Sequence, residues 1–223
     1  GTITLVVQEV GASTRQMGLL SAGESIRDLA GPLGRPSEVE KFGTVVCVGG
    51  GVGIAPIYPI ARALKEAGNR VITLIDVKAN YLFYWENKLK RVSDRLLVSS
   101  RDSFYNSKEY IPRQLDSLIG GEERIDRVVA IGCTYLMSSC SEATRGAGIP
   151  TMVSLNPIMV DGTGMCGACR VSVGGETKFG CVDGADSDGH AVDFEELMRR
   201  QRVYNDLERE ADADYSRTCT CHS

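Results

Sequence analysis

Between residues 41 and 155, short apolar runs alternate with stretches in which apolar residues recur at helical spacing. Thr44–Val48 is a short apolar run, as expected for a strand that is buried on both faces. Ile54–Ala67 then carries apolar residues three and four positions apart, and Gly68 provides a natural helix end. Further strands are expected over Val71–Ile75, Leu96–Ser99, Val128–Ile131 and Thr151–Leu155, and further helices over Tyr81–Lys90 and Leu136–Thr144. This alternation predicts a parallel sheet with right-handed crossovers.

The first 40 residues follow a different pattern, which is typical of β-structure. Thr2–Val10 alternates apolar and polar residues, Gly11–Thr14 is expected to turn, and Ser25–Leu29 is a second short strand. One or two strands cannot bury a core alone. We therefore expect this segment to be part of a β domain, which either sequence upstream or a partner chain completes.

Residues 156–190 are rich in glycine and contain two short strand-like runs. These runs, Arg170–Val173 and Thr177–Phe179, predict a hairpin. A charged helix is expected over Asp193–Glu210, followed by a polar tail. The expected fold class is α/β, with a parallel-sheet domain between an N-terminal β piece and a small C-terminal domain that ends in a helix. The four expected parts are residues 1–40, 41–155, 156–190 and 191–223.

Composition narrows the classes of function. The 223 residues suffice for one large domain or two smaller ones. A net charge of −4 and a pI near 5.3 argue against nucleic acid as a partner. No apolar run approaches the roughly 20 residues of a membrane span, and the N-terminus resembles a strand rather than a targeting leader. Eight cysteines in such a chain favour a cytosolic, metal-binding protein over a secreted one with disulfides.

A glycine-rich turn directly follows the first expected strand of the sheet and opens a helix. Its sequence is Gly49-Gly50-Gly51-Val52-Gly53-Ile54-Ala55-Pro56. Glycines there permit a tight turn and the close approach of a pyrophosphate, for which a helix N-terminus offers N–H groups. The pattern departs from G-x-G-x-x-G because Pro56 takes the place of the third glycine. Its position in a βαβ unit favours nucleotide binding, and a glycine turn without a ligand is the alternative.

Two charged residues end the next strand of that unit. An acid such as Asp76 at this place usually bonds an adenosine ribose hydroxyl and repels a 2′-phosphate. Lys78, two residues further on, favours the phosphate instead. Solvated loop charges explain both residues equally well, so the sequence favours NAD(H) over NADP(H) only slightly.

The pattern with the most specific chemistry is Asp161-x4-Cys166-x2-Cys169-x11-Cys181. Plant-type [2Fe–2S] sites use a C-x4-C-x2-C…C spacing, in which Asp161 occupies the place of the first ligand. One alternative is zinc, for which Cys-x2-Cys is a half-site, although His190 is more simply a loop residue. The other alternative is that the aspartate only stabilises a glycine-rich turn.

The remaining cysteines carry weaker signals. Cys47 and Cys140 occupy apolar positions in an expected strand and helix, and we expect them to be small core residues. Cys219, Cys221 and His222 in the tail have metal-binding side chains, but a complete site needs further ligands that the tail does not offer.

Three features together resemble a known family. They are the turn Gly49–Pro56, the loop Asp161–Cys169, which we call the cluster loop, and the stretch Cys181–Gln201, CVDGADSDGHAVDFEELMRRQ. The chain is similar to the ferredoxin–NADP reductase superfamily. Within it, the chain resembles the small (alpha) subunits of NADH-dependent reduced ferredoxin:NADP oxidoreductases, also called sulfide dehydrogenases. Dihydroorotate dehydrogenase electron-transfer subunits are relatives that normally have cysteine where this chain has Asp161. The resemblance covers nearly the whole chain.

The resemblance implies an FAD-binding β-barrel, which would be partial in residues 1–40, an NAD(P)-binding domain over 41–155 and a [2Fe–2S] domain over 156–190. It also implies a large flavoprotein partner subunit with [4Fe–4S] clusters, and ferredoxin is a further candidate partner. Ser13 and Thr14 are implied to bind FAD. The residues expected to bind the nicotinamide nucleotide are Gly49, Gly51, Val52, Gly53, Ile54, Ala55, Pro56, Asp76, Cys133 and Met137, and the expected cluster ligands are Asp161, Cys166, Cys169 and Cys181.

Three positions depart from the family pattern. The flavin-binding segment of the family would lie upstream of Gly1. The motif Cys-Gly-Pro-x-x-Met is replaced by Gly132-Cys133-Thr134-Tyr135-Leu136-Met137 in this chain, and the Gly-x-Arg turn is replaced by Asp76-Val77-Lys78. These departures bear on flavin and nicotinamide binding rather than on the cluster.

We therefore expect an electron-transfer oxidoreductase subunit. In this hypothesis NAD(P)H gives a hydride to FAD, and single electrons then pass to the [2Fe–2S] cluster and to the large subunit. Such an assembly is a candidate for electron bifurcation. The main alternative is a non-catalytic relay subunit that keeps the cluster but has lost flavin or nicotinamide binding. A zinc-stabilised binding domain is a third hypothesis.

Overall fold

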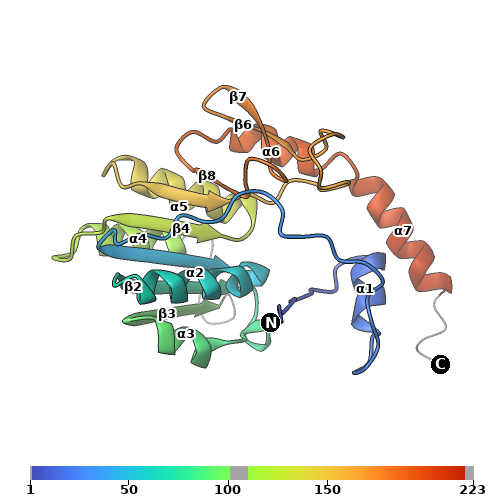
Figure 1. Ribbon diagram of the computed structural model, residues 1–223, viewed down its shortest axis with the longest axis horizontal. Helices are drawn as coiled ribbons and strands as arrows, with labels where there is room; N and C mark the ends of the chain where they lie inside the picture. The colour runs from blue at the N-terminus through green and yellow to red at the C-terminus, as the bar shows by residue number, and fades with distance from the viewer. Residues whose placement is uncertain (1, 101–109, 219–223) are drawn as a thin grey trace.

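The computed structural model describes residues 2–100 and 110–218 (Figure 1). Its centre is a six-stranded sheet in the order β3-β2-β1-β4-β5-β8. The strands are β1 (Thr44–Gly50), β2 (Arg70–Val77), β3 (Arg95–Ser100), β4 (Arg127–Ile131), β5 (Thr151–Ser154) and β8 (Asp186–Asp188). All neighbouring strands among β1 to β5 are parallel, and β8 is antiparallel to β5. The predicted α/β class with a mostly parallel sheet is confirmed.

Helices cover both faces of this sheet, which gives three layers (Figure 1). One face carries α2 (Ile54–Glu66) and α3 (Glu86–Val92), and the other carries α4 (Tyr110–Ile119) and α5 (Thr134–Arg145). Gly68 follows α2 with a φ of +86°, which confirms it as the residue that ends the helix. Among the described residues, no helix has the length and apolar composition needed to cross a membrane.

The core consists of two apolar clusters, one on each face of the sheet. Val46 and Val48 of β1 belong to the cluster under α4 and α5, whereas Val45 and Cys47 belong to the cluster under α2. Burial raises the pKa of the Cys47 thiol to about 12. Cys140 in α5 is also fully buried. Both cysteines are therefore core residues, as the sequence predicted.

The turn between β1 and α2 lies directly against the end of β4. A Cβ atom at Gly53 would collide with the carbonyl oxygen of Ile131. Only glycine lets the two backbones approach so closely. Gly51, where the turn begins, has a φ of +56°, in the left-handed region that favours glycine. These two glycines allow α2 to begin beside the carboxyl end of β4.

The N-terminal segment differs from the prediction. The strands expected over Thr2–Val10 and Ser25–Leu29 are absent, and residues 2–43 contain a single helix, α1 (Ala12–Gly18). A strand needs a neighbour for its backbone hydrogen bonds, and no strand of the described residues pairs with this segment. Its apolar side chains are consequently exposed, Ile3 by 74%. The partial β-barrel therefore stays a prediction.

The C-terminal part contains the expected hairpin, formed by β6 (Arg170–Val173) and β7 (Glu176–Phe179). The one helix expected over Asp193–Glu210 is instead two, α6 (Phe194–Gln201) and α7 (Asn205–Thr218). Buried Leu197 holds α6 on the core, whereas α7 has no buried side chain among its described residues. Packing therefore keeps α6 on the body of the molecule, and α7 points away from it (Figure 1).

Besides α1, helix α4 and strand β8 were not predicted from the sequence, and one predicted helix was misplaced. The helix expected over Tyr81–Lys90 forms later, as α3. Helix α4 contains Pro112 in its first turn, where the missing N–H costs no hydrogen bond. Strand β8 is short and polar, and it pairs only with β5 at the edge of the sheet. Helix α4 has a periodic signal that the sequence analysis overlooked, since Ile111, Leu115 and Leu118 recur at helical spacing, whereas β8 is too short to show one.

Two glycine substitutions test the contact between α2 and β4. Gly53 and Gly146 both have right-handed helical φ and ψ angles, but a Cβ at Gly146 meets no atom within 4 Å. We expect Gly53→Ala to destabilise the protein by about 1–3 kcal/mol because its Cβ meets backbone. Gly146→Ala should stabilise it by about 0.4–1 kcal/mol. Urea unfolding measures both, and equal effects would contradict the proposed steric contact.

Candidate functional site

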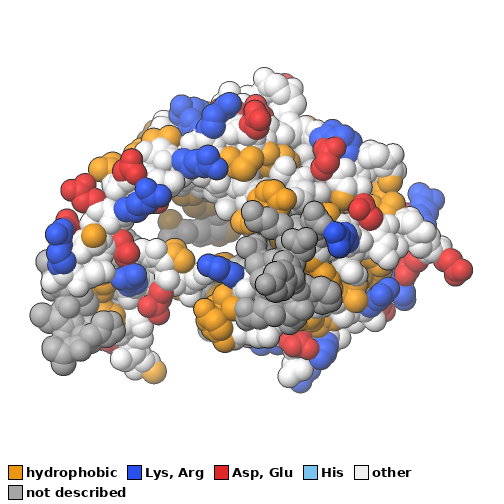
Figure 2. Space-filling view, turned by 180° about the vertical axis from the view of Figure 1, so that it is seen from behind, with side chains coloured by type: hydrophobic (Ala, Val, Ile, Leu, Met, Phe, Trp, Pro, Cys, Tyr) orange, Lys and Arg blue, Asp and Glu red, His pale blue; other side chains and the backbone are white. Residues whose placement is uncertain are grey.

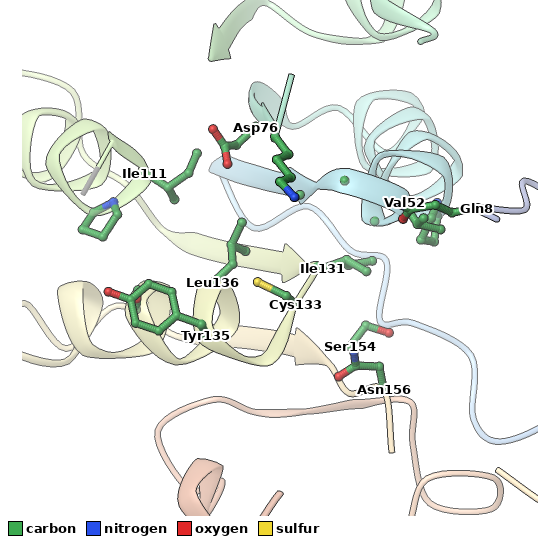
Figure 3. Close-up of a pocket in the computed structure, with 18 residues that line it drawn as sticks. Gln8, Val52, Asp76, Ile111, Ile131, Cys133, Tyr135, Leu136, Ser154 and Asn156 are labelled. Carbon is green, nitrogen blue, oxygen red and sulfur yellow. The ribbon is translucent and has the colours of Figure 1, made fainter. Parts of the chain in front are cut away.

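A cavity of about 480 Å³ opens at the carboxyl ends of β1, β2, β4 and β5 (Figure 3). It lies where the chain reverses its course across the sheet, because β2 adjoins β1 on one side and β4 adjoins it on the other. Open α/β sheets bind ligands in the crevice at such a switch point. Figure 3 shows Val52, Asp76, Cys133 and Asn156 around this space.

Six of the residues expected to bind nucleotide line the cavity. They are Gly51, Val52, Gly53, Pro56, Asp76 and Cys133. The other four are not among the lining residues. Gly49 lies within β1, Ile54 and Met137 are fully buried in the two cores, and Ala55 follows Ile54 in α2. Gly49 faces α2, since its Cβ position meets Ile57 and Ile54, and only one face of each helix can meet the cavity. These four residues therefore support the wall rather than form it.

The cavity also contains residues that the sequence analysis did not single out. Ser154 and Asn156 come from the end of β5 and the residues after it, and Tyr135 and Ser139 come from α5. The strand-end residues had a usable signal, because the carboxyl ends of parallel strands meet at one edge. Gln8, which also lines the cavity, had no such signal in the sequence, since it lies in a segment without regular structure.

Asp76 and Lys78 reach the cavity together at the end of β2. Asp76 is only 8% exposed. Burial, with a contribution from the charge of Asp76, raises the pKa of Tyr110 at the start of α4. Lys78 is exposed. The cavity therefore offers a carboxylate suited to ribose hydroxyls and, beside it, a cation suited to a phosphate.

Aromatic side chains before α3 support the glycine turn. The Tyr84 hydroxyl donates to the carbonyl oxygen of Val52 at 3.0 Å and to that of Gly51 at 3.3 Å. Its ring meets Trp85 edge to face, with centroids 5.6 Å apart. Burial raises the pKa of Tyr84, so the hydroxyl keeps its proton and remains a donor. These contacts hold the turn that borders the cavity.

The second candidate site is the loop that begins at Asp161. The carboxylate of Asp161 accepts hydrogen bonds from the backbone amides of Thr163, at 2.9 Å, and Cys166, at 3.0 Å. These bonds lower the pKa of Asp161, so the group is charged at neutral pH. Asp161 and Cys166 are both exposed. The first two expected cluster ligands therefore lie on one short loop.

Cys169 and Cys181 lie on the protein side of this loop. Their Sγ atoms are 3.3 Å apart, and the residues are 3% and 4% exposed. Backbone amides face the sulfurs: the amide of Ala168 lies 3.4 Å from Cys166 Sγ, and that of Cys181 lies 3.5 Å from Cys169 Sγ. The Cys169 thiol and burial raise the pKa of Cys181. A bound metal would displace that proton, because metals bind thiolates.

The remaining candidate for a zinc ligand lies elsewhere. His190 Nε2 is 3.0 Å from Thr144 Oγ1, within a buried hydroxyl network. In residues 2–100 and 110–218, no three His, Cys, Asp or Glu side chains converge closely enough to hold one metal ion. A two-iron cluster divides its four ligands between two metal atoms, so it does not require such convergence. Cys219, Cys221 and His222 lie outside the described residues.

The residues implied to bind flavin lie at the start of α1, away from the cavity. Thr14 Oγ1 accepts hydrogen bonds from the amides of Val10, at 3.0 Å, and Gly11, at 3.1 Å. The hydroxyl of Thr14 thus stabilises its own helix, whereas Ser13 is exposed. Figure 2 shows a hollow between this part of the chain and the body of the molecule, with hydrophobic side chains on its walls.

Comparisons with known proteins identify the relatives of this chain. Residues 156–193 match the model of the iron–sulfur cluster binding domain of dihydroorotate dehydrogenase B. The chain is 46% identical over 209 residues to a Thermotoga maritima protein named dihydroorotate dehydrogenase B (NAD(+)), electron transfer subunit homolog, covering 94% of this chain and 73% of that protein. An uncharacterised Clostridium beijerinckii protein from the adh 3′ region is 43% identical over 219 residues, covering 95% and 74%.

A solved structure shows the same fold. It was described for insights into flavin-based electron bifurcation via the NADH-dependent reduced ferredoxin–NADP oxidoreductase, and it matches with a TM-score of 0.86 and 44% identity. The match covers 94% of this chain and 75% of that chain. The resemblance inferred from the sequence is thereby confirmed. The chain belongs to the family of electron-transfer subunits of dihydroorotate dehydrogenase B and their homologues.

Proposed function

We propose that this chain passes electrons between NAD(P)H, FAD and a [2Fe–2S] cluster, to or from a larger flavin and iron–sulfur subunit. The observation that carries the proposal is the arrangement of the cluster loop. Its buried thiol pair, Cys169 and Cys181, lies under a loop that carries one further thiol and a charged carboxylate. The same residues fall within the part of the chain that matches an iron–sulfur cluster binding domain.

Asp161, Cys166, Cys169 and Cys181 are the proposed cluster ligands. The donor set fits an iron–sulfur cluster because it combines three sulfurs with backbone amides directed at two of them. The hydrogen bonds that Asp161 accepts leave lone pairs on both oxygens, since each carboxylate oxygen has two. When bound, the cluster would supply one-electron transfer. The loop would supply the ligands, and its N–H groups would tune the cluster potential.

The cavity at the sheet edge is the proposed nicotinamide nucleotide site. Gly51, whose Cβ position is open, allows the close approach of a pyrophosphate, and Gly53 sets the start of α2 against β4 beside it. Asp76 would accept hydrogen bonds from a ribose, and Lys78 would pair with a 2′-phosphate where one is present. Cys133 borders the same cavity at the start of α5. We favour NAD(H) because Asp76 is the more buried of the two charged residues.

We propose FAD as the third redox group on the basis of family membership. Flavin accepts two electrons from a nicotinamide and passes them on one at a time. Neither the nicotinamide nor the iron–sulfur cluster can make this conversion. Ser13 and Thr14 stay the proposed contacts, although Thr14 also stabilises α1. The proposed partner is a large flavoprotein subunit with [4Fe–4S] clusters, with ferredoxin as a further candidate partner. We place the complex in the cytosol, because its clustered cysteines are proposed to bind metal.

Measurements of metal content, flavin binding and NADH-driven dye reduction together test this function. Anaerobically purified protein should contain iron and acid-labile sulfide, and with FAD it should reduce a dye at the expense of NADH. An intact cluster without flavin binding or NADH-driven reduction would favour the relay subunit. Protein that contains zinc and no iron after anaerobic preparation would end the proposal.

Substitution of Asp161 tests the ligand set. Loss of a residue that only orients a metal ligand already weakens metal binding about tenfold or more. We therefore expect Asp161→Ala, which removes a ligand itself, to weaken cluster binding by more than about tenfold. Asp161→Cys should retain iron but change the EPR spectrum of the dithionite-reduced protein, since the ligand atom changes. Asp28, whose side chain is 89% exposed, provides the control substitution Asp28→Ala. Normal iron content and an unchanged spectrum in Asp161→Ala would show that this aspartate is no ligand.

Binding titrations test the nucleotide site. Asp76→Asn keeps the shape of the side chain but removes its charge, so we expect the Kd for NADH to rise about tenfold, or ~1.4 kcal/mol. The Kd for NADPH should change less, because repulsion of its 2′-phosphate is lost as well. Lys78→Gln should weaken NADPH binding more than NADH binding. The proposal fails if both variants bind both nucleotides as the unaltered protein does.

A further inference from the structure

The last two residues of α6 make contacts in two directions. The guanidinium of Arg200 donates to the carbonyl oxygen of Ala168 at 3.1 Å. The side-chain amide of Gln201 donates to the backbone oxygen of Asn156 at 2.9 Å and to its Oδ1 at 3.0 Å. Thr134 Oγ1 in turn donates to Gln201 Oε1 at 2.7 Å. One end of a single helix therefore contacts both the cluster loop and the start of α5.

Both ends of α6 are held in place. Asp193 accepts a hydrogen bond from the amide of Glu196 at 2.8 Å, which stabilises the first turn. The amide of Asp193 also donates to the carbonyl oxygen of Ser172 in β6 at 2.9 Å. Leu197, one turn before Arg200, is 1% exposed within the core under α4 and α5. Helix α6 can therefore act as a rigid support for the side chains at its end.

The contacts of Arg200 fall on the segment between two proposed ligands. Only Gly167 and Ala168 separate Cys166 from Cys169. Arg170 donates to the carbonyl oxygen of Gly167 at 3.2 Å, and Arg200 donates to that of Ala168. Each of the two carbonyl groups in this segment is thus held by an arginine.

This arrangement sets the direction of the loop amides. In a planar trans peptide, the C=O and N–H groups point in opposite directions. The carbonyl group of Gly167 shares its peptide with the amide of Ala168, which faces Cys166 Sγ at 3.4 Å. By the same geometry, a guanidinium on the Ala168 carbonyl turns the amide of Cys169 away from α6. Arg170 therefore helps to hold the Ala168 N–H toward the Cys166 sulfur, as an anionic cluster requires, and Arg200 fixes the plane of the next peptide.

Arg200 also lies at a groove beside the loop. The groove has a volume of about 300 Å³ and is lined by Cys166, Arg170, Leu197, Arg200 and Gln201, among others. Gln201, which also lines this groove, bonds to Asn156, and Asn156 lines the nucleotide cavity. Helix α6 therefore joins the rim of one proposed site to the loop of the other.

We propose that Arg200 is a positioning residue for the cluster, and that Arg200 and Gln201 together form a clamp which fixes the cluster loop against the nucleotide cavity. This inference rests on the proposed function of the loop. An arginine stays charged at all accessible pH values, so it contributes a constant positive field. Because reduction adds a negative charge to the cluster, that field favours the reduced state and raises the reduction potential.

The first test uses metal-free protein and needs no cluster. We expect hydrogen exchange of the amides in residues 162–169 to be about tenfold faster in Arg200→Gln, because a hydrogen bond from a charged group is lost. Arg199→Gln is the matched control, since Arg199 precedes Arg200 in α6 and is exposed. Gln201→Ala should also speed exchange in the loop. If the loop amides exchange at the same rate in Arg200→Gln as in Arg199→Gln, the proposed clamp is wrong.

The second test measures the reduction potential of the loaded protein by EPR-monitored titration. We expect Arg200→Gln to make one-electron reduction about tenfold less favourable, a downward shift of about 59 mV. Arg200→Lys keeps the charge, so its potential should shift less, while its loop exchanges faster because the planar fork is lost. A potential unchanged in Arg200→Gln would overturn the electrostatic part of the proposal. Absence of iron from the unaltered protein would instead refute the proposed function, and the exchange comparison would still decide whether Arg200 holds the loop.

Discussion

The rest of the structure depends on the pairing of β1 with β2 on one side and β4 on the other. Because Val45–Val48 are fully buried, β1 has a firmly set register between its neighbours. The chain leaves β1 through a glycine turn, forms one side of the sheet, and returns to form the other. The carboxyl ends of four strands therefore meet around one cavity. The glycines matter because α2 must begin in contact with the backbone of β4.

The parallel sheet could be predicted because its signal is local. Apolar runs such as Val71–Ile75 are long enough to identify a buried strand without knowledge of its neighbours. The prediction of N-terminal strands was wrong because a strand forms only beside a partner strand, and that requirement is not local. The break between α6 and α7 could not be predicted from the sequence either, because no glycine or proline marks it. Burial of Leu197 decides instead where the packed helix lies. Pro112 shows that a helix breaker is harmless in a first turn.

The candidate sites could be predicted where a motif and its geometry lie on one segment. The spacing from Asp161 to Cys181 places the proposed ligands on one loop and directly after the hairpin that follows, and two of their sulfurs lie 3.3 Å apart. Met137 shows the limit of this reasoning: the motif identifies a helix but does not say which face meets the cavity, and this residue is buried. Gln201 and Asn156 were missed because a bond across 45 residues leaves no local pattern.

An electron-transfer subunit needs fixed distances and fixed charges more than it needs acids and bases. The contacts around the cluster loop fit that requirement, because they are made largely to backbone amides and carbonyls, whose protonation does not change with pH. The charged groups that reach the loop from outside are arginines, whose guanidinium groups remain charged and whose planar shape sets direction. A lysine in the same place would supply charge without fixing the peptide planes. Under the function and the role of α6 proposed above, the chemistry of this protein would depend on how rigidly α6 holds a few peptide groups, and less on any single reactive side chain.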